Sequence, residues 1–356
     1  MKKTALIMAG GRGERFWPKS RKNLPKQFLN LTDDGKTMLQ LTAERVLPLM
    51  DIDSVFIVTN RSYKTLVQEQ LPDLPVENIL CEPTARNTAP CIGLGAVHIE
   101  RKYGDAVMFV LPSDHLITYP QIFRRTLSDA AKTAESGAAL VTIGIAPTYP
   151  ETGYGYIRFR PGEMFQSAYA VDGFVEKPDL DMAKSYVQSQ QYLWNSGMFI
   201  WKVSTILDNL QKHLPDVWEG LNRIKQAIGT EEQEDVLERE FRQFPSVSID
   251  YGVMEKAKNL YILTGAFGWD DVGSWLALER MREKNDFGNI IVGNVVTVGT
   301  RNSTIQGEKK LIAAVGVDNL IVIDTEDALL VCGKNSVGDI RKVIENLKTC
   351  NRTEYL

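Results

Sequence analysis

The chain has 356 residues, of which 44% are hydrophobic and 24% are charged, a balance that is ordinary for a globular enzyme. A formal net charge of -4 argues against nonspecific binding to nucleic acid, and no apolar run approaches the ~20 residues of a membrane span. The four cysteines lack metal-type spacing and no apolar leader precedes the first predicted strand, so we expect a cytoplasmic protein with reduced cysteines.

The first predicted element is a buried strand over residues 5–8, which runs into a glycine-rich turn. Gly10, Gly11 and Gly13 let the backbone turn sharply and approach a ligand closely. Several cations follow in the next stretch of chain: Arg12, Arg15, Lys19, Arg21, Lys22 and Lys26. Backbone N–H groups in such a turn, surrounded by Arg and Lys, are typical of a polyphosphate site. The alternative is an ordinary tight turn with solvated charges.

Two common phosphate-binding loops do not fit this turn. A P-loop needs Gly-Lys followed by Ser or Thr, and no Gly-Lys follows Gly13. The dinucleotide fingerprint needs a third glycine where Phe16 stands, and an acidic residue about 20 positions further on. The acids at that distance, Asp33 and Asp34, lie in a polar turn and not at the end of a second strand. We therefore do not expect NAD binding.

Strand and helix patterns alternate as far as residue 145. The expected order is a helix over 37–49, a strand over 54–60, a helix over 61–70, a strand over 78–81, a helix ending near 102, a strand over 106–111, a helix over 120–136 and a strand over 139–145. Asn87 or Thr88 is expected to cap the third helix. This alternation predicts a mostly parallel, Rossmann-like α/β sheet covered by helices, with ligands at the carboxyl ends of its strands.

The regular alternation of predicted strands and helices ends near residue 150. Strand-like segments are expected over 153–159, 170–178 and 193–201, and charged helical segments over 202–258. From about 288 to 333, short β-like runs alternate with Gly, Asn and Asp, and an amphipathic helix follows over 336–348. We therefore predict a catalytic domain over 1–285. A small β-rich domain, resembling a short β-helix and ending in a helix, is predicted over 286–356.

Carboxylates at two places suit a divalent cation. Asp114 follows the strand over 106–111, and Asp270 and Asp271 lie in a Gly-flanked turn. Mg²⁺ prefers one or two carboxylates together with phosphate oxygens and water. One Asp alone is better explained as a turn cap, but two places together predict Mg²⁺ or another divalent cation as cofactor. With three His residues in the whole chain, a His-based mechanism is not expected.

Three ordered motifs carry a family resemblance: Gly-Gly-x-Gly-x-Arg at 10–15, Trp-Pro-x-Ser-Arg at 17–21 and Pro-Lys-Gln-Phe at 25–28. They resemble the signature of sugar-1-phosphate nucleotidylyltransferases. Phe-Trp-Pro-Lys-Ser-Arg is similar to the version in the mannose-1-phosphate guanylyltransferase (GDP-mannose pyrophosphorylase) branch. The resemblance covers about residues 1–285. Glu14 stands where many relatives carry Thr or Ser, and we expect it to point away from the ligand or to pair with Arg12 or Arg15.

The resemblance implies transfer of GMP from GTP to mannose 1-phosphate, with in-line attack of the sugar phosphate on the α-phosphate and release of pyrophosphate. The implied catalytic residues are Arg15, Lys26, Asp114 and Asp271, of which Asp114 and Asp271 hold the metal. The implied nucleotide-binding residues are Ala9, Gly10, Gly11, Gly13, Arg15, Lys26, Glu82, Arg86, Asn87 and Thr88. The implied sugar-phosphate-binding residues are Gly155, Glu176, Lys177 and Asn195.

Other readings stay open at this point. The substrate can be another hexose or heptose 1-phosphate, or another nucleoside triphosphate. A noncatalytic nucleotide-sugar sensor is a different class, and the joint presence of Arg15, Lys26, Asp114 and Asp271 argues against it. The expected partners are GTP and mannose 1-phosphate, with no nucleic acid and no membrane. We also expect a homodimer formed through the C-terminal half.

Overall fold

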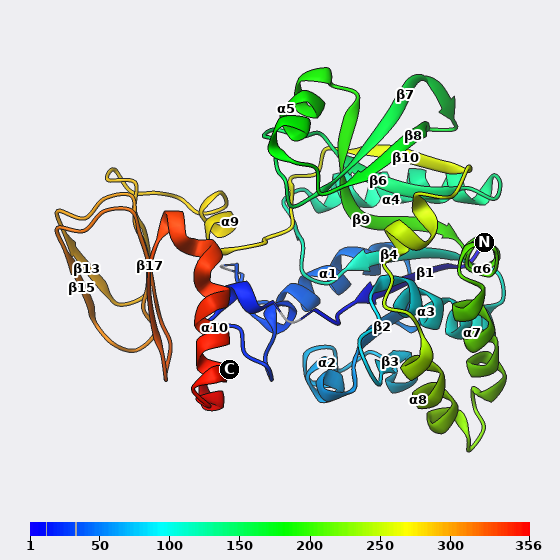
Figure 1. The fold of residues 1–356 in the computed structure, drawn as a ribbon, viewed down its shortest axis with the longest axis horizontal. Helices are drawn as coiled ribbons and strands as arrows, with labels where there is room; N and C mark the ends of the chain where they lie inside the picture. Colours follow the sequence, from blue (N-terminus) through cyan, green and yellow to red (C-terminus); the bar gives the residue numbers. More distant parts are fainter. Residues whose placement is uncertain (12, 33) are drawn as a thin grey trace. The chain divides into compact units, whose positions relative to one another are not determined.

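The computed structural model describes residues 1–11, 13–32 and 34–356 (Figure 1). Arg12 and Asp33, which the sequence patterns brought forward, lie outside the described residues. Contacts group the chain into two compact units. The first comprises Met1–Gly10, Gln40–Ser113 and Ile117–Trp269, and the second comprises Gly11–Leu39, Asp114–Leu116 and Asp270–Leu356. The domain boundary predicted at 285/286 does not coincide with this grouping by contacts, in which each unit comprises several segments of the chain. It stays a prediction.

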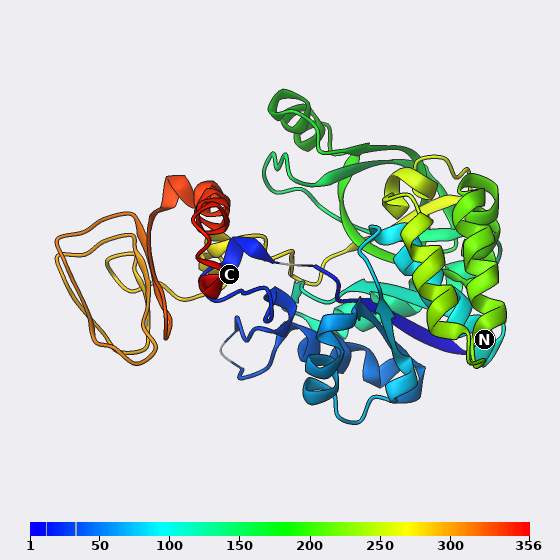
Figure 2. The same cartoon turned by 60° about the horizontal axis from the view of Figure 1, so that its bottom comes forward.

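The first unit is built on a nine-stranded sheet in the order β3-β2-β1-β4-β9-β6-β10-β8-β7 (Figures 1 and 2). Its strands are β1 (Lys3–Met8), β2 (Val55–Asn60), β3 (Ile79–Glu82), β4 (Val107–Pro112), β6 (Leu140–Ile145), β7 (Gly155–Phe165), β8 (Ala168–Glu176), β9 (Tyr192–Lys202) and β10 (Leu260–Gly265). β9 is antiparallel to β4 and β6, and β8 is antiparallel to β10 and β7, so these two strands run against the others. The predicted mostly parallel α/β sheet is therefore confirmed.

Helices cover both faces of this sheet. They are α1 (Met38–Val46), α2 (Lys64–Gln70), α3 (Thr88–Tyr103), α4 (Pro120–Glu135), α5 (Leu180–Ser189), α6 (Val203–His213), α7 (Pro215–Ala227) and α8 (Gln233–Gln243). Leu6 of β1 and Met108 of β4 are buried in one core with side chains of α3 and α6, and α4 packs against β4, β6 and β9 on the opposite face. Burial on both faces explains the uninterrupted apolar run of β4. Within the described ranges, no helix combines the length and apolarity that crossing a bilayer requires.

Short stacked strands form much of the second unit. They are β12 (Ile290–Val292), β13 (Val295–Val298), β14 (Thr304–Gln306), β15 (Ile312–Val315), β16 (Leu320–Asp324) and β17 (Leu329–Gly333). β12, β14 and β16 pair in parallel, β17 pairs antiparallel with β16, and β13 pairs in parallel with β15. Because strands of successive turns pair in parallel, the chain coils as in a β-helix. The helices are α9 (Trp275–Glu279) and α10 (Ile340–Thr349), so the predicted β-rich segment that ends in a helix is confirmed. The remaining short strands are β5 (Leu116–Ile117) and β11 (Trp269–Asp270).

Inside the second unit, the segment that follows the glycine turn shares a hydrophobic core with the C-terminal segment. Phe16 and Trp17 are buried in one cluster with Trp275, and the same cluster contains Ile340 and Ile344 of α10. The rings of Phe16 and Trp275 lie 5.2 Å apart between centroids. The amphipathic pattern of α10 indicates a buried face, and this cluster is what that face covers.

Polar contacts fasten the same two segments together. The indole Nε1 of Trp17 donates to the carbonyl oxygen of Tyr355 over 2.8 Å, and Nε1 of Trp275 donates to the carbonyl oxygen of Trp17 over 3.2 Å. Arg21 forms an ion pair with Asp327 over 2.6 Å. Trp17 and Arg21 are thus held by residues that lie 258 to 338 positions later in the chain.

Candidate active site

The glycine turn begins where the first unit's strand β1 ends. Ala9 is buried, and its N–H donates to the carbonyl oxygen of Val58 over 2.7 Å. Gly13 has a positive φ of 58°, which favours glycine. A Cβ at that position would lie 2.3 Å from Cβ of Lys26, so a side chain there would displace Lys26. Gly13 is therefore required for the close approach of two backbone segments in the second unit.

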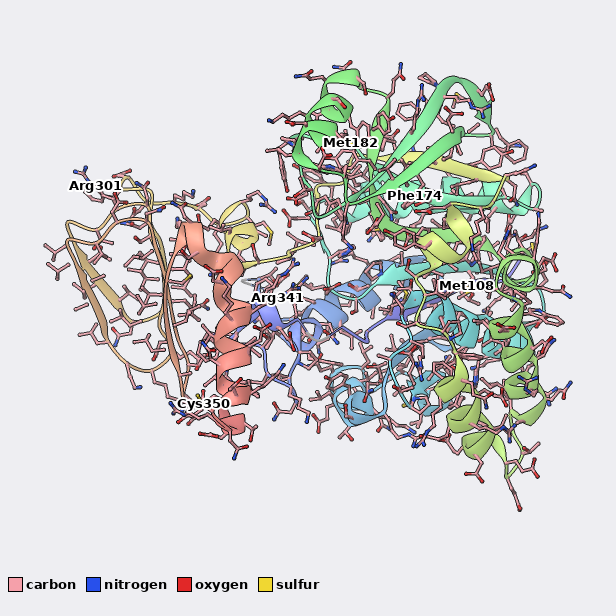
Figure 3. All side chains as sticks on the ribbon, viewed as in Figure 1. Met108, Phe174, Met182, Arg301, Arg341 and Cys350 are labelled. Carbon is pink, nitrogen blue, oxygen red and sulfur yellow. The ribbon has the colours of Figure 1, made fainter. Side chains whose placement is uncertain are left out.

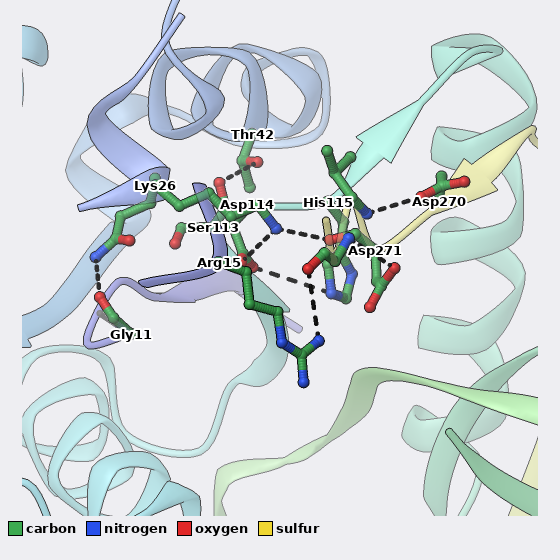
Figure 4. Close-up of polar contacts among 12 residues, drawn as sticks. Gly11, Arg15, Lys26, Thr42, Ser113, Asp114, His115, Asp270 and Asp271 are labelled. Atoms are coloured by element: carbon green, nitrogen blue, oxygen red, sulfur yellow. Dashed lines mark hydrogen bonds and ion pairs between the residues drawn. The ribbon is translucent and has the colours of Figure 1, made fainter. Parts of the chain in front are cut away.

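Lys26 is the most buried cation of the predicted site, with 4% of its surface exposed. It begins the short 3₁₀ helix η2 (Lys26–Phe28). Its Nζ donates to Oδ2 of Asp114 over 2.8 Å and to the carbonyl oxygen of Asp271 over 2.7 Å (Figure 4). The next residue, Gln27, donates from Nε2 to the carbonyl oxygen of Gly11 over 2.9 Å. The Pro-Lys-Gln motif thus joins the glycine turn to both predicted metal ligands.

The carboxylate of Asp114 is held in its charged form. Burial opposes the ionisation of Asp114, but the positive charge of Lys26, the neighbouring imidazole of His115 and the hydrogen bond from Lys26 together hold the pKa of this carboxyl below its ordinary value. The imidazole Nε2 of His115 lies 4.0 Å from Oδ1 of Asp114. A carboxylate that stays ionised is the form in which Asp binds a cation.

The Gly-flanked turn gives its two Asp residues different surroundings. Oδ1 of Asp270 accepts from the N–H of Val272 over 2.8 Å, and its Oδ2 accepts two hydrogen bonds from Arg280. Asp270 therefore caps the turn and anchors Arg280. Oδ1 of Asp271 accepts a local bond of 3.1 Å from the N–H of Gly273. This turn brings Asp271, and not Asp270, beside Lys26.

The second unit contains a hollow of about 410 Å³ on which these groups converge. Its charged and titratable lining residues are Glu14, Arg15, Lys26, Asp114, His115, Asp271 and Arg341. In the parts of the chain that the structure describes, no group of three or more His, Cys, Asp or Glu side chains is placed to hold a metal. Two carboxylates on one hollow nevertheless fit a divalent ion whose other ligands are phosphate oxygens and water.

Two residues of the glycine turn face other parts of the second unit. Arg15 is exposed, and its Nη1 donates to the carbonyl oxygen of Gly273 over 3.5 Å. Glu14 lines the hollow, and its Oε1 lies 3.7 Å from Nζ of Lys348 on α10. The structure gives no pair between Glu14 and Arg15, and the alternative partner, Arg12, lies outside the described residues, so the expected pairing stays a prediction. A lysine 334 positions later in the chain gave no local signal that could have identified it as the partner.

A group of predicted sugar-binding residues lies together in the first unit. A Cβ on Gly155 would come within 2.5 Å of Oε2 of Glu176 and 3.3 Å of Cβ of Asn195, so these three residues surround one small space. Nζ of Lys177 lies 3.0 Å from Oε1 of Glu176. Nδ2 of Asn195 donates to Oδ1 of Asp250 over 2.9 Å. Asn195 lies in a largely apolar strand, where a polar side chain requires a hydrogen-bond partner. That partner is Asp250.

Asp250 is a candidate site residue that sequence reasoning did not single out. It opens the π-helical turn η7 (Asp250–Met254). Burial raises the pKa of Asp250 to about 6, and the negative charge of Glu176 acts in the same direction. By its sequence, the segment Ile249–Lys256 in which it stands is an ordinary helix start.

Glu82 ends β3 and is another carboxyl of the first unit whose pKa is raised. Only 6% of its surface is exposed, and its Oε1 is buried without a hydrogen-bond partner among the described residues. A Cβ on Gly10 would lie 3.4 Å from its Oε2. Burial raises the pKa of Glu82 to about 8. A buried carboxyl without a partner in the described chain, close to Gly10, requires an explanation that the fold itself does not supply.

The three other predicted nucleotide-binding residues near Glu82 already make bonds within the first unit. Arg86 donates to the backbone carbonyls of Phe241 and Arg242. Asn87 caps α3, as one of the two expected capping residues, by accepting from the N–H of Thr88 over 2.8 Å. Oγ1 of Thr88 accepts from the N–H of Ile249 over 2.8 Å. These side chains hold the segment after β3 in place, and their contact with a nucleotide stays a prediction.

Comparison with known proteins identifies the family. The family model described as nucleotidyl transferase matches residues 4–286, and that described as MannoseP isomerase/GMP-like beta-helix domain matches residues 293–347. The first match covers well over half of the chain, so the protein belongs to the nucleotidyl transferase family. It is therefore an enzyme of the transferase class, as the family resemblance implied.

Relatives agree with this assignment along almost the whole chain. A mannose-1-phosphate guanylyltransferase of Salmonella montevideo is 41% identical over 362 residues, which cover 99% of this chain and 75% of that protein. One of Escherichia coli K12 is 40% identical over 358 residues, covering 98% of this chain and 74% of that protein. A crystal structure described as mannose-1-phosphate geranyltransferase from Thermus thermophilus is 35% identical, with a TM-score of 0.88 over 98% of this chain and 100% of that one. The predicted family resemblance is confirmed.

Proposed function

We propose that this nucleotidyltransferase transfers GMP from GTP to mannose 1-phosphate, giving GDP-mannose and pyrophosphate. The observation that carries the proposal is the position of Lys26, whose ammonium bonds to both Asp114 and Asp271 on one hollow. The names of the relatives at about 40% identity support the two substrates.

The chemistry of this reaction needs charge and alignment more than proton transfer. An anionic oxygen of mannose 1-phosphate attacks the α-phosphorus of GTP, a new P–O bond forms, and the bond from the α-phosphorus to the bridging oxygen breaks. Pyrophosphate leaves with that oxygen and its electron pair. Because the nucleophile is already an anion, no general base is required, which suits a chain with three His residues. Catalysis then rests on positioning and on neutralising phosphate charge.

Residues of the second unit would supply that neutralisation. Lys26 and Arg15 would contact the triphosphate, and Lys26 also keeps Asp114 ionised for a cation. Mg²⁺ or another divalent ion held by Asp114 and Asp271 would add positive charge to the phosphate oxygens when bound. The backbone of Gly11 and Gly13 would approach the phosphates without a side chain in the way.

Glu82 supports guanine as the base. In the free protein the raised pKa of about 8 keeps Glu82 protonated, and bound guanine would stabilise the ionised form, because its N1–H and N2–H₂ lie side by side and donate to both oxygens of a carboxylate. Its buried Oε1 has no partner among the described residues, which is what a ligand contact would satisfy. Glu82→Gln tests this contact. The amide has one carbonyl oxygen that accepts a hydrogen bond, and its NH₂ group repels the second donor of guanine. Roles for Ala9, Gly10, Arg86, Asn87 and Thr88 in shaping this nucleotide subsite belong to the same proposal.

Gly155, Glu176 and Asn195 would bind the mannose hydroxyls, and Lys177 would bind the sugar phosphate. Glu176 and Asn195 carry acceptors and a donor around the one space that the missing side chain of Gly155 leaves. Asp250 fixes the amide of Asn195 so that it presents a defined geometry. These groups suit a polyol, because each sugar hydroxyl can both donate to a carboxylate and accept from an amide.

A pyrophosphate-release assay with Mg²⁺ tests the proposal directly. It pairs each of GTP, ATP, CTP and UTP with mannose, glucose, galactose and a heptose 1-phosphate. Release with GTP and mannose 1-phosphate above all other pairs is the expected result. Release with another pair would replace the substrates and keep the class. Binding of GTP without release in any pair would favour a noncatalytic sensor.

We also propose a homodimer, in a cytoplasmic enzyme, formed through the β-helix-like strands. The β13–β15 register sets Val298 beside Val315, and both are more than half exposed. Val296 on the same face is also exposed. Light scattering at several concentrations should give twice the 40.0 kDa chain mass for the native protein, and the monomer mass for a Val298→Lys, Val315→Lys variant. A native protein that stays monomeric would end this proposal.

A further inference from the structure

Helix α10 of the second unit presents an arginine to the hollow of the phosphate site. Arg341 is the second residue of α10 (Figure 3). It lines the same hollow as Arg15 and Lys26. Ile340 and Ile344 lie one turn apart on the buried face of α10, in the core that also holds Phe16. The helix that carries Arg341 is therefore fixed to the segment that follows the glycine turn.

Within the described chain, the guanidinium of Arg341 has no counter-ion. Among these residues, no acceptor forms a hydrogen bond or an ion pair with it. Its neighbours on the helix differ: Nζ of Lys342 lies 2.8 Å from Oδ1 of Asp339, and Lys348 faces Glu14 at 3.7 Å. Arg341 is thus a cation on a concave surface whose charge no group of the described chain neutralises.

The balance of charges that line the hollow favours binding of a polyanion. Asp114 is neutralised by Lys26 and Glu14 faces Lys348. If Asp114 and Asp271 hold a divalent cation, the hollow carries a net positive charge to which Arg341 contributes. The planar guanidinium donates two parallel hydrogen bonds to a phosphate group, a geometry that a lysine does not provide.

We propose that Arg341 binds the β- and γ-phosphates of the nucleoside triphosphate, and with them the pyrophosphate that leaves. This inference rests on the proposed function and extends the phosphate site to the C-terminal helix. The sugar phosphate has Lys177 of the first unit as its proposed cation, whereas Arg341 shares its hollow with the groups proposed for the triphosphate. Arg341 is then a binding residue for the leaving group, which neither the motifs nor the family resemblance indicated.

Binding of inorganic pyrophosphate with Mg²⁺, measured by calorimetry on the full chain, tests the inference without turnover. Arg341→Ala should weaken binding about tenfold, as expected for the loss of one charged hydrogen-bonding group. Arg341→Lys should fall between the two, because the charge remains and the bidentate geometry does not. Lys342→Ala is the matched control, since it removes the adjacent charge, which does not line the hollow, and it should bind like the native protein.

Steady-state kinetics supply a second readout. Arg341→Ala should raise KM for GTP and lower kcat, and leave KM for mannose 1-phosphate unchanged. Pyrophosphate binding by Arg341→Ala equal to that of the native chain would overturn the inference, as would an equal loss in Lys342→Ala. Turnover with a different substrate pair, together with a selective loss of pyrophosphate binding in Arg341→Ala, would overturn the proposed substrates and leave the role of Arg341 standing.

Discussion

Trp17 and Tyr355 are joined by a hydrogen bond of 2.8 Å from the indole Nε1 to the backbone carbonyl, although 338 positions separate them in the chain. Trp17 lies between two catalytic candidates, Arg15 and Lys26, and Tyr355 is the second-last residue of the sequence. The segment that carries the predicted phosphate contacts is therefore part of the same compact unit as the C-terminal residues.

Trp17→Phe should isolate the contribution of that hydrogen bond. The ring still fills its buried position, but the carbonyl of Tyr355 loses its donor, so the free energy of unfolding should fall by about 1 kcal/mol. Urea unfolding followed by circular dichroism measures the change. Trp218→Phe is the control, because the indole N–H of Trp218 has no acceptor among the described residues. Equal losses in both variants would mean that ring size matters and the bond does not.

Asp271→Asn and Lys26→Ala should each abolish turnover while the fold remains. Asp271→Asn removes one of two carboxylates for the metal, and Lys26→Ala removes the ammonium between Asp114 and Asp271. Loss of one such electrostatic contact lowers kcat on the order of 100- to 1000-fold. Pyrophosphate release is the assay, and far-ultraviolet circular dichroism reports the fold.

The control for these two variants is Lys22→Ala, which removes an exposed cation from the same segment but not from the hollow. It should keep near-normal turnover. Near-normal rates in Asp271→Asn or Lys26→Ala would contradict the catalytic assignment.

Gly155→Ala should impair the sugar side of the reaction selectively. Its Cβ would lie 2.5 Å from Oε2 of Glu176, so Glu176 must move out of position. A displacement of about 1 Å costs roughly 10- to 100-fold in kcat/KM for mannose 1-phosphate. Gly162→Ala, on the same strand but with nothing within 4 Å of the added atom, should behave like the native enzyme. A rise in KM for GTP alone would contradict the assignment of Gly155 to the sugar subsite.

Glu82 should make the stability of the protein fall as pH rises. Its pKa is about 8 in the folded protein and 4.5 for an ordinary solvated Glu, as in the unfolded chain, so the folded state holds the proton through that window. The stabilisation is complete below about pH 4.5, decreases as pH rises, and is lost above pH 8, by a few kcal/mol in all. Glu82→Gln cannot ionise, and it should therefore be more stable than the native chain at pH 8 and similar near pH 4.

Melting temperatures at pH 4, 6 and 8 measure this difference. Glu77→Gln is the control, because Glu77 is a surface residue five positions earlier whose side chain is 72% exposed. A constant difference between Glu82→Gln and the native chain across the three pH values would contradict the assignment of a neutral Glu82.

Local patterns predicted the parts of the site that lie within a few residues of one another. Gly13 was identifiable from its motif, and the structure adds that its role is close contact with Lys26. Asp271 was distinguished from Asp270 by the family motif, and the different hydrogen bonds of the two carboxylates give a physical reason. Alternating apolar strands and helices predicted the sheet, because each element carries its own periodicity.

Pairings between distant segments could not be predicted in the same way. An amphipathic helix indicates that one face of α10 is buried, but not that Phe16 lies against it. The Glu14–Lys348 pair and the place of Arg341 on the hollow follow from that packing. Asp250 was missed for a related reason, since its partner Asn195 lies 55 positions earlier on another element.

The bond between Trp17 and Tyr355 also joins residues that are made at widely separated times during synthesis. Residue 17 is synthesised well before Ile340, Ile344 and Tyr355, which hold its segment. At ordinary rates of protein synthesis, the two ends of this contact are separated by about 20 to 70 s. A ribosome-bound or prematurely ended chain can therefore complete its central sheet and still lack an ordered phosphate site.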